Sequence, residues 1–115
     1  MMDDLYLELQ SKTKQLEASI RQLRRSGTDY AEAERDYKIL LRQECLKLRD
    51  AGTAIGMIDK CAYGIPSVAE ARFKRDVALV VYEANKDAIQ SIKLQLRLID
   101  AQLSREWGAS GKGDF

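Results

Sequence analysis

Apolar residues recur along the first part of the chain at steps of three, four or seven positions. The series consists of Leu9, Leu16, Ile20, Leu23, Tyr30, Tyr37, Leu41 and Leu48. Steps of this kind place side chains on one face of an α-helix and form the heptad seam of a coiled coil. The pattern therefore predicts a long amphipathic helix over about residues 3–49.

Gly27 interrupts the apolar series in the middle of this helix. Glycine costs about 1 kcal/mol relative to alanine in a helix interior, and Asp29 with Glu32 three residues later has the spacing of an N-terminal capping pair. A true break at this point is one interpretation. The heptad phase nevertheless continues through Gly27, and a break would keep that phase only by coincidence. We therefore expect one helix with a kink near residue 27.

Two glycines bracket a short predicted helix in the middle of the chain. Gly52 follows Arg49, Asp50 and Ala51, and we expect it to adopt the left-handed conformation that ends many helices. Thr53 has the side chain of an N-cap, which predicts a helix over about 54–62 that Gly64 ends.

The last helix has a clear start signal and a long uninterrupted body. Pro66 favours an extended entry, and Ser67 lies three residues before Glu70, which is the spacing of a capping box. Residues 68–107 contain no Pro and no Gly, so we expect one helix over this range. Its predicted seam consists of Val77, Val81, Ala84, Ala88, Ile92, Leu96, Ile99 and Leu103.

Two long helices of similar length, joined through a short one, define the predicted architecture. The fold class is all-α: a long antiparallel helical hairpin, similar to a coiled coil, with a short helix at its tip. The hairpin would form one domain over residues 1–107. Residues 108–115 are rich in Gly and polar residues, and we expect a flexible tail.

The last helix is apolar on more than one face. Every position of 77–82 is apolar, and further apolar residues lie off the seam. One partner helix cannot cover all of them, and apolar surface left in water costs about 25 cal/mol per Å². We therefore predict self-association into a helical bundle. The predicted interface residues are Val77, Val80, Val81, Ile89, Leu94 and Leu98.

Composition and charge narrow the class of function. The 115 residues include 19 Lys and Arg and 18 Asp and Glu, and neither half of the chain has a marked excess of one sign. This balance lowers the expectation of binding to duplex nucleic acid. The acidic start at Asp3 and Asp4, and the lack of any apolar run of about 18 residues, disfavour secretion and membrane spanning. Cys45 and Cys61 lie outside any CxxC spacing, which predicts reduced thiols in the cytoplasm.

No catalytic or metal site is predicted. The chain has no histidine, which excludes Ser/His and Cys/His nucleophile systems and the commonest zinc ligand sets within it. Glu32 and Asp36, or Glu83 and Asp87, lie four apart on one helical face and have the spacing for acid–base work or for a divalent ion. Such pairs are ordinarily solvated helix positions. We therefore expect no enzyme and no cofactor.

Arg72, Lys74 and Arg75 form the candidate binding cluster. They lie near the N-terminus of the predicted last helix, where the helix dipole disfavours cations, so they need a partner. That partner is either an acidic residue at the end of the first helix, Glu44 or Asp50, or a bound anion such as a nucleotide or nucleic-acid phosphate. Residues 54–75 also imitate a helix-turn-helix, but the length of the last helix favours an interhelical tip.

Five short stretches carry a resemblance to a known group of proteins. They are 29–38, 48–52, 68–77, 92–98 and 105–108. In these stretches, and over most of its length, the chain resembles uncharacterised small helical phage and prophage proteins of Gram-positive bacteria. The genes of that group often lie near single-strand-binding and recombination genes. The resemblance implies a phage protein that acts in the host cytoplasm, and it implies no established activity.

Two functions follow from these expectations. The first is a non-enzymatic oligomeric phage accessory protein that binds a phage or host protein in the early programme of replication, recombination or host takeover. The alternative is a ligand-binding anti-defence module. It would sequester a nucleotide signal, or bind single-stranded nucleic acid, through Arg72, Lys74 and Arg75.

Overall fold

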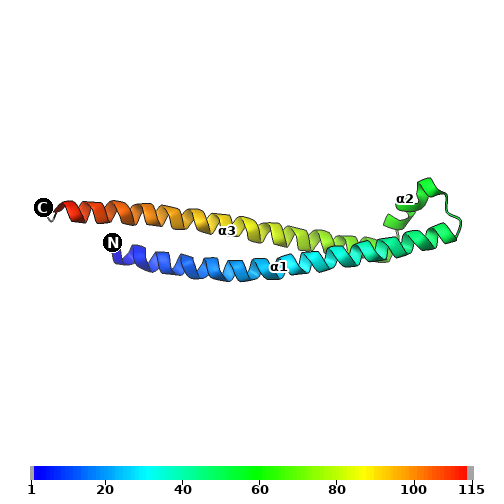
Figure 1. Cartoon of the computed structure of the whole chain (residues 1–115), viewed down its shortest axis with the longest axis horizontal. Helices are drawn as coiled ribbons and strands as arrows, with labels where there is room; N and C mark the ends of the chain where they lie inside the picture. Colours follow the sequence, from blue (N-terminus) through cyan, green and yellow to red (C-terminus); the bar gives the residue numbers. More distant parts are fainter. Residues whose placement is uncertain (1, 114–115) are drawn as a thin grey trace. The chain divides into compact units, whose positions relative to one another are not determined.

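Helices make up almost the whole chain. A computed structural model describes residues 2–113, and their side chains over residues 2–109. Of the part of the chain that the structure describes, 94% is helical, and no strand occurs there. The elements in chain order are α1 (Met2–Asp50), the 3₁₀ turn η1 (Ile55–Met57), α2 (Ile58–Tyr63) and α3 (Pro66–Gly113) (Figure 1). The predicted all-α class is confirmed.

The contacts within the chain group its residues into two units. Unit 1 combines Met1–Arg24 with Ala84–Phe115, and unit 2 is Arg25–Glu83. The sequence predicted a single domain over 1–107. Contacts between paired helices are local along the helix axis, so each unit makes its own set of contacts between a segment of α1 and a segment of α3.

Unit 2 pairs the second half of α1 with the beginning of α3. The ring of Tyr30 stacks against that of Tyr82, with 6.0 Å between centroids and 12° between planes. The guanidinium carbon of Arg75 lies 4.5 Å from the centroid of Tyr37. A higher number on α1 thus meets a lower number on α3, so the two segments are antiparallel.

Unit 1 pairs the beginning of α1 with the end of α3, and the two segments again run in opposite directions (Figure 1). Leu5, Ile99 and Leu103 form a buried cluster, against which Met2 and Leu9 pack. This small apolar cluster holds the two segments together, since every one of its members would otherwise be in water.

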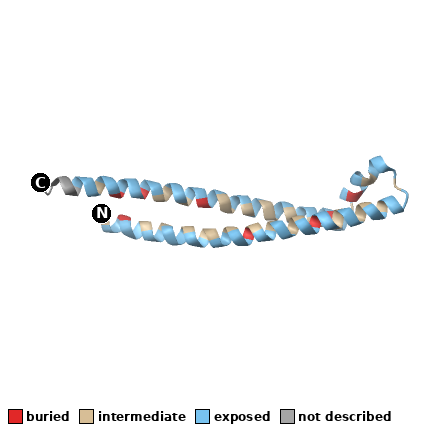
Figure 2. Cartoon of the chain, viewed as in Figure 1, coloured by how far each residue is buried: buried red, intermediate tan, exposed pale blue. Residues whose placement is uncertain are grey.

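The predicted seam of α1 is confirmed. Leu9, Leu16, Leu23, Tyr30 and Tyr37, which follow one another at steps of seven, are all buried or partly buried. Figure 2 shows such positions recurring along both long helices. Seven-residue spacing keeps these side chains on the face that meets α3.

The first half of the predicted α3 seam is wrong by one residue. Four predicted members are exposed: Val77, Val81, Ala84 and Ala88. The residues that follow them are buried or partly buried instead: Ala78, Tyr82, Asn85 and Ile89. With Ile92, Leu96, Ile99 and Leu103, as predicted, the seam then advances by alternate steps of four and three. This is an uninterrupted heptad repeat, and hydropathy missed it because it includes a small and a polar residue. Asn85 is accommodated because its Nδ2 donates a hydrogen bond to the carbonyl oxygen of Gln22 at 3.4 Å.

Helix α1 continues through Gly27 without a break, so the alternative of two separate helices is wrong. The glycine has a packing role. A Cβ atom at residue 27 would lie 3.2 Å from Cε1 of Tyr82, which is closer than an ordinary van der Waals contact. Gly27 therefore gives the tyrosine ring room to lie against the α1 backbone.

The left-handed conformation predicted for Gly52, just beyond the end of α1, is confirmed. Gly52 has a φ of 88°, in the left-handed region that side chains with a Cβ disfavour. Its N–H donates to the carbonyl oxygen of Arg49, and the N–H of Thr53 donates to that of Leu48, both at 3.0 Å. These two bonds form a Schellman motif, which satisfies carbonyl groups left over at the helix end.

The 3₁₀ turn η1 and helix α3 begin differently from the prediction. The residue before η1 is Ala54, and no side-chain hydrogen bond caps it, so Thr53 is not the N-cap. Helix α3 begins at Pro66, two residues before the predicted start, and Ser67 lies inside it. Proline suits the first helical position because its missing N–H would have no partner there and its φ is already helical.

Helix α3 extends to Gly113, whereas the sequence predicted an end near residue 107. Glycine raises the entropic cost of a helix without blocking it sterically, and no proline follows Pro66, so the backbone can stay helical here. Residues 114 and 115 of the predicted tail lie outside the described residues.

Candidate functional site

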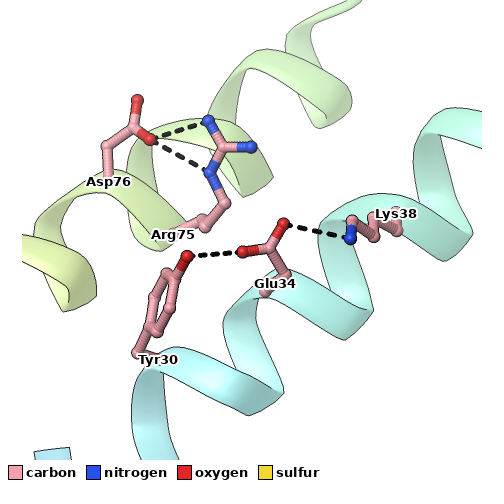
Figure 3. Close-up of polar contacts among 5 residues, drawn as sticks. All are labelled: Tyr30, Glu34, Lys38, Arg75 and Asp76. Atoms are coloured by element: carbon pink, nitrogen blue, oxygen red, sulfur yellow. Dashed lines mark hydrogen bonds and ion pairs between the residues drawn. The ribbon is translucent and has the colours of Figure 1, made fainter. Parts of the chain in front are cut away.

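Arg75 contacts two residues, the adjacent Asp76 and Tyr37 of α1. Its Nε and Nη2 atoms donate to Oδ1 of Asp76 at 3.0 and 2.8 Å, as Figure 3 shows. The hydrogen bond to Asp76 is the main reason why the pKa of Arg75 lies above its ordinary value. The guanidinium also covers the ring of Tyr37, which is only 5% exposed. Arg75 thus makes a cation–π contact with a buried tyrosine ring.

The other two members of the predicted cluster have different surroundings. The guanidinium carbon of Arg72 lies 5.5 Å from the ring centroid of Tyr63 in α2. Lys74 lines a groove that also contains Asp29 and Glu70. Since Arg72, Lys74 and Arg75 each face a different set of neighbours, they do not converge on one anion site.

The acidic partners proposed for this cluster are also wrong. Glu44 pairs with Lys47 at 3.1 Å, and Asp50 pairs with Arg49 at 3.6 Å. The reason is the register of the helices, which brings Arg75 to Tyr37, two turns before Glu44.

Glu34 is partly buried and links a tyrosine and a lysine of the same helix, α1 (Figure 3). The hydroxyl of Tyr30 donates to Oε2 of Glu34 at 2.6 Å, and Nζ of Lys38 lies 3.5 Å from Oε1. The hydrogen bond from Tyr30 lowers the pKa of Glu34, with a smaller contribution from Lys38. The same bond raises the pKa of Tyr30. The positive charge of Arg75 on α3 makes a further small contribution to the lowered pKa of Glu34.

A groove of about 520 Å³ runs between α1 and α3 in unit 2. Four carboxylates line it, and Lys74 is its one cation among the described residues. Its lining residues are Asp29, Glu32, Ala33, Asp36, Leu40, Ser67, Glu70, Ala71 and Lys74. We name this the acidic groove. The predicted carboxylate pair Glu32 and Asp36 is therefore part of a larger acidic surface. Asp29, which the sequence suggested only as a cap, shares the helical face of Asp36 because it lies seven residues earlier.

An apolar depression of about 240 Å³ adjoins the acidic groove, because Asp29 and Lys74 line both. Its other lining residues are Ser26, Phe73, Val77, Ala78 and Val81. Phe73 is 62% exposed, and Val77 and Val81 are 45% and 44% exposed. Charge and apolar surface thus lie side by side in unit 2.

Five of the six predicted interface residues are exposed. Val77, Val80, Val81, Leu94 and Leu98 all lie on the surface of α3, and Val80 is the most open at 68%. Ile89 is the exception: it is buried in unit 1, with 5% of its surface exposed. It occupies a position of the corrected heptad, so it faces α1 and is not available to a second molecule.

No metal-binding group of side chains occurs in the part of the chain that the structure describes. Among the described side chains of residues 2–109, no group of three or more Cys, Asp or Glu has the arrangement to hold a metal ion. Cys45 is partly buried and Cys61 is exposed, and both are free thiols. None of the described helices is long and apolar enough to cross a membrane.

No family model, no curated protein and no solved structure matches the chain. The resemblance to small helical phage proteins is not tested by these comparisons and stays a prediction, and the candidate site rests on its own geometry.

Proposed function

We propose that this chain is a protein-binding helical module that acts by association and not by catalysis. The observation that carries the proposal is the exposed apolar surface of α3. In unit 2 it comprises Phe73, Val77, Val80 and Val81, which follow one another at steps of four, three and one. These steps place all four side chains on one stripe of the helix.

Exposed apolar stripes of this kind mark interaction surfaces. Single apolar residues on a protein surface are ordinary, but contiguous patches are a mark of binding sites for other proteins. In unit 1, Leu94 and Leu98 are 53% and 62% exposed and lie one turn apart. Both segments of α3 therefore have apolar side chains for a further helix to cover.

Self-association is the simplest form of this function. A second copy would cover Val80 and Leu94, and the product would be a helical bundle with four or more long helices. We also propose a phage or host protein as a second partner of the same module.

The anion-binding alternative has less support. Arg75 already donates two hydrogen bonds to Asp76, and Lys74 lies beside the carboxylates of Asp29 and Glu70. Carboxylates repel a phosphate group, so binding of a nucleotide or nucleic acid at Lys74 would be opposed.

Sedimentation velocity over a range of micromolar concentrations tests the self-association. The parent chain should sediment faster as its concentration rises. The double variant Val80→Lys with Leu94→Lys should need a concentration at least about tenfold higher for the same shift, because it places charge in the interface.

The matched control is the double variant Leu7→Lys with Ile39→Lys. Both residues are exposed apolar positions of α1, at 64% and 52%, and this variant should associate like the parent. A parent chain that sediments as a monomer at every concentration would contradict the proposal of self-association.

A further inference from the structure

The acidic groove carries negative charge that the described part of the chain leaves without a partner. Of its four carboxylates, only Asp36 has an ion pair among the described residues, with Arg35 at 3.1 Å. Asp29, Glu32 and Glu70 have none within those residues. The single Lys74 cannot neutralise all of them, so the groove has a net negative potential and attracts cations.

The adjoining depression is apolar, so an apolar group and not a cation would cover it. Phe73, Val77 and Val81 follow one another at steps of four along α3, and all three are at least 44% exposed. A ridge of side chains at steps of four fits into the groove of another helix. Phe73 is the large aromatic group of this ridge, and buried aromatic residues dominate the energy of many interfaces.

From the two features together we infer that unit 2 docks a basic amphipathic helix of a partner protein. The apolar face of that helix would cover Phe73, Val77 and Val81, and its flanking lysines or arginines would lie against Glu32, Glu70 and the other carboxylates. This mode of recognition is the helix-in-groove mode. The inference rests on the proposed protein-binding function and specifies the chemistry of the partner.

Charge complementarity selects this occupant. A nucleic acid or an anionic membrane surface would bring negative charge to a negative groove, which is unfavourable. A neutral apolar helix would cover the ridge but would leave the carboxylates facing apolar groups, at the cost of their hydration. Only a helix with both an apolar face and cationic flanks satisfies the two surfaces at once.

The acidic groove also sets the dependence of binding on salt. The carboxylates at its rim are exposed to solvent, so salt screens their attraction for a basic helix. Association should therefore slow as the ionic strength rises, while the apolar contacts at Phe73 keep dissociation slow.

The test uses two designed helical peptides that carry a fluorescent label and share one leucine pattern. One has lysine at every polar position and the other has glutamate, and binding to the full chain is measured by fluorescence anisotropy. The lysine peptide should bind the parent chain, and the glutamate peptide should not. The double variant Glu32→Lys with Glu70→Lys should bind the lysine peptide at least about tenfold more weakly.

The matched control is Glu17→Lys with Asp87→Lys, which changes the net charge by the same amount at exposed positions outside the groove. It should keep the affinity of the parent within about threefold. A second variant, Phe73→Ser, leaves every charge in place and should also weaken binding. Circular dichroism reports whether each variant is folded.

Three results would overturn the inference. The first is that the lysine peptide does not bind. The second is that the control variant loses as much affinity as the groove variant. The third is that Glu32→Lys with Glu70→Lys abolishes self-association of the chain, which would identify a second copy as the occupant. In the first two cases, self-association that persists in sedimentation would leave the proposed function standing. The two failures are therefore distinguishable.

Discussion

The ring of Tyr82 lies against the backbone of α1 where residue 27 has no side chain. A Cβ atom there would come within 3.2 Å of the ring's Cε1. A glycine inside a long helix is unfavourable by about 1 kcal/mol relative to alanine, and this contact explains why the helix contains one. The same ring stacks on Tyr30. One aromatic residue of α3 therefore contacts α1 at two positions that lie three residues apart.

Replacement of Gly27 by alanine should not give the stabilisation that helix propensity alone predicts. The added methyl group forces the Tyr82 ring to move, which offsets the gain. In a Tyr82→Ala background the ring is gone, and Gly27→Ala should raise the free energy of unfolding by about 1 kcal/mol. Urea denaturation of the four proteins in this double-mutant cycle measures the difference.

Gly108 is the control for this cycle. It is also a helical glycine, but nothing lies within 4 Å of a Cβ atom placed there. Gly108→Ala should therefore stabilise the helix whether or not Tyr82 is present. Gly27→Ala could stabilise the parent chain by as much as it stabilises the Tyr82→Ala variant. That result would mean that the close approach of the Tyr82 ring has no energetic role.

Arg75→Ala should destabilise unit 2 by about 1 kcal/mol, because the guanidinium and its aliphatic stem cover a buried tyrosine ring. The matched variant is Arg72→Ala, whose partner Tyr63 is 43% exposed. Its effect should stay within about 0.5 kcal/mol. Denaturation midpoints of both variants provide the measurement. Equal effects would mean that burial of Tyr37 does not distinguish the two cation–π contacts.

The Tyr30–Glu34 hydrogen bond should make stability depend on pH at both ends of the scale. The pKa of Glu34 is lowered in the folded chain, so its contribution is complete above the unfolded pKa of about 4.3 and is lost as the pH falls through the folded value. The pKa of Tyr30 is raised, so its contribution is complete below about 10 and is lost as the pH rises through the folded value.

The difference in stability between the parent and Tyr30→Phe measures this bond. It should be largest and flat between the two unfolded pKa values, and it should decline outside them. Tyr6→Phe is the control, since Tyr6 is 49% exposed and no hydrogen bond of its hydroxyl is found among the described residues. A Tyr30→Phe difference that stays constant from acid to alkaline pH would count against the bond.

The sequence predicted those features that one residue or one spacing determines. Apolar residues at steps of seven predicted the seam of α1. Gly52 predicted where the helix ends, because glycine adopts a positive φ without a steric cost. The start of α3 was placed two residues late, since the capping box at Ser67 and Glu70 competes with Pro66 as a start signal. Such a choice depends on which backbone N–H groups find partners, and spacing alone does not decide it.

The candidate site was harder to predict than the fold. Arg72, Lys74 and Arg75 are close in sequence, but a helix turns by about 100° per residue, so they point in different directions. The acidic groove combines Glu32 on α1 with Glu70 on α3, and their proximity depends on the register between the two helices. The polar Asn85 inside the seam obscured that register, because hydropathy counts it as an exposed position.

Helix α3 has two apolar stripes, one buried and one exposed, that differ by one residue. A rotation of the helix by about 100° around its own axis would exchange them. In unit 2 the exposed stripe includes Val77 and Val81, which are also apolar. Hydrophobicity alone therefore does not decide which stripe of α3 meets α1. Shape helps to separate them, because Tyr82 lies where a Cβ atom on residue 27 would come within 3.2 Å of its ring. Gly27 therefore favours one of two competing packings, because it leaves room for the ring that only the observed packing buries against α1.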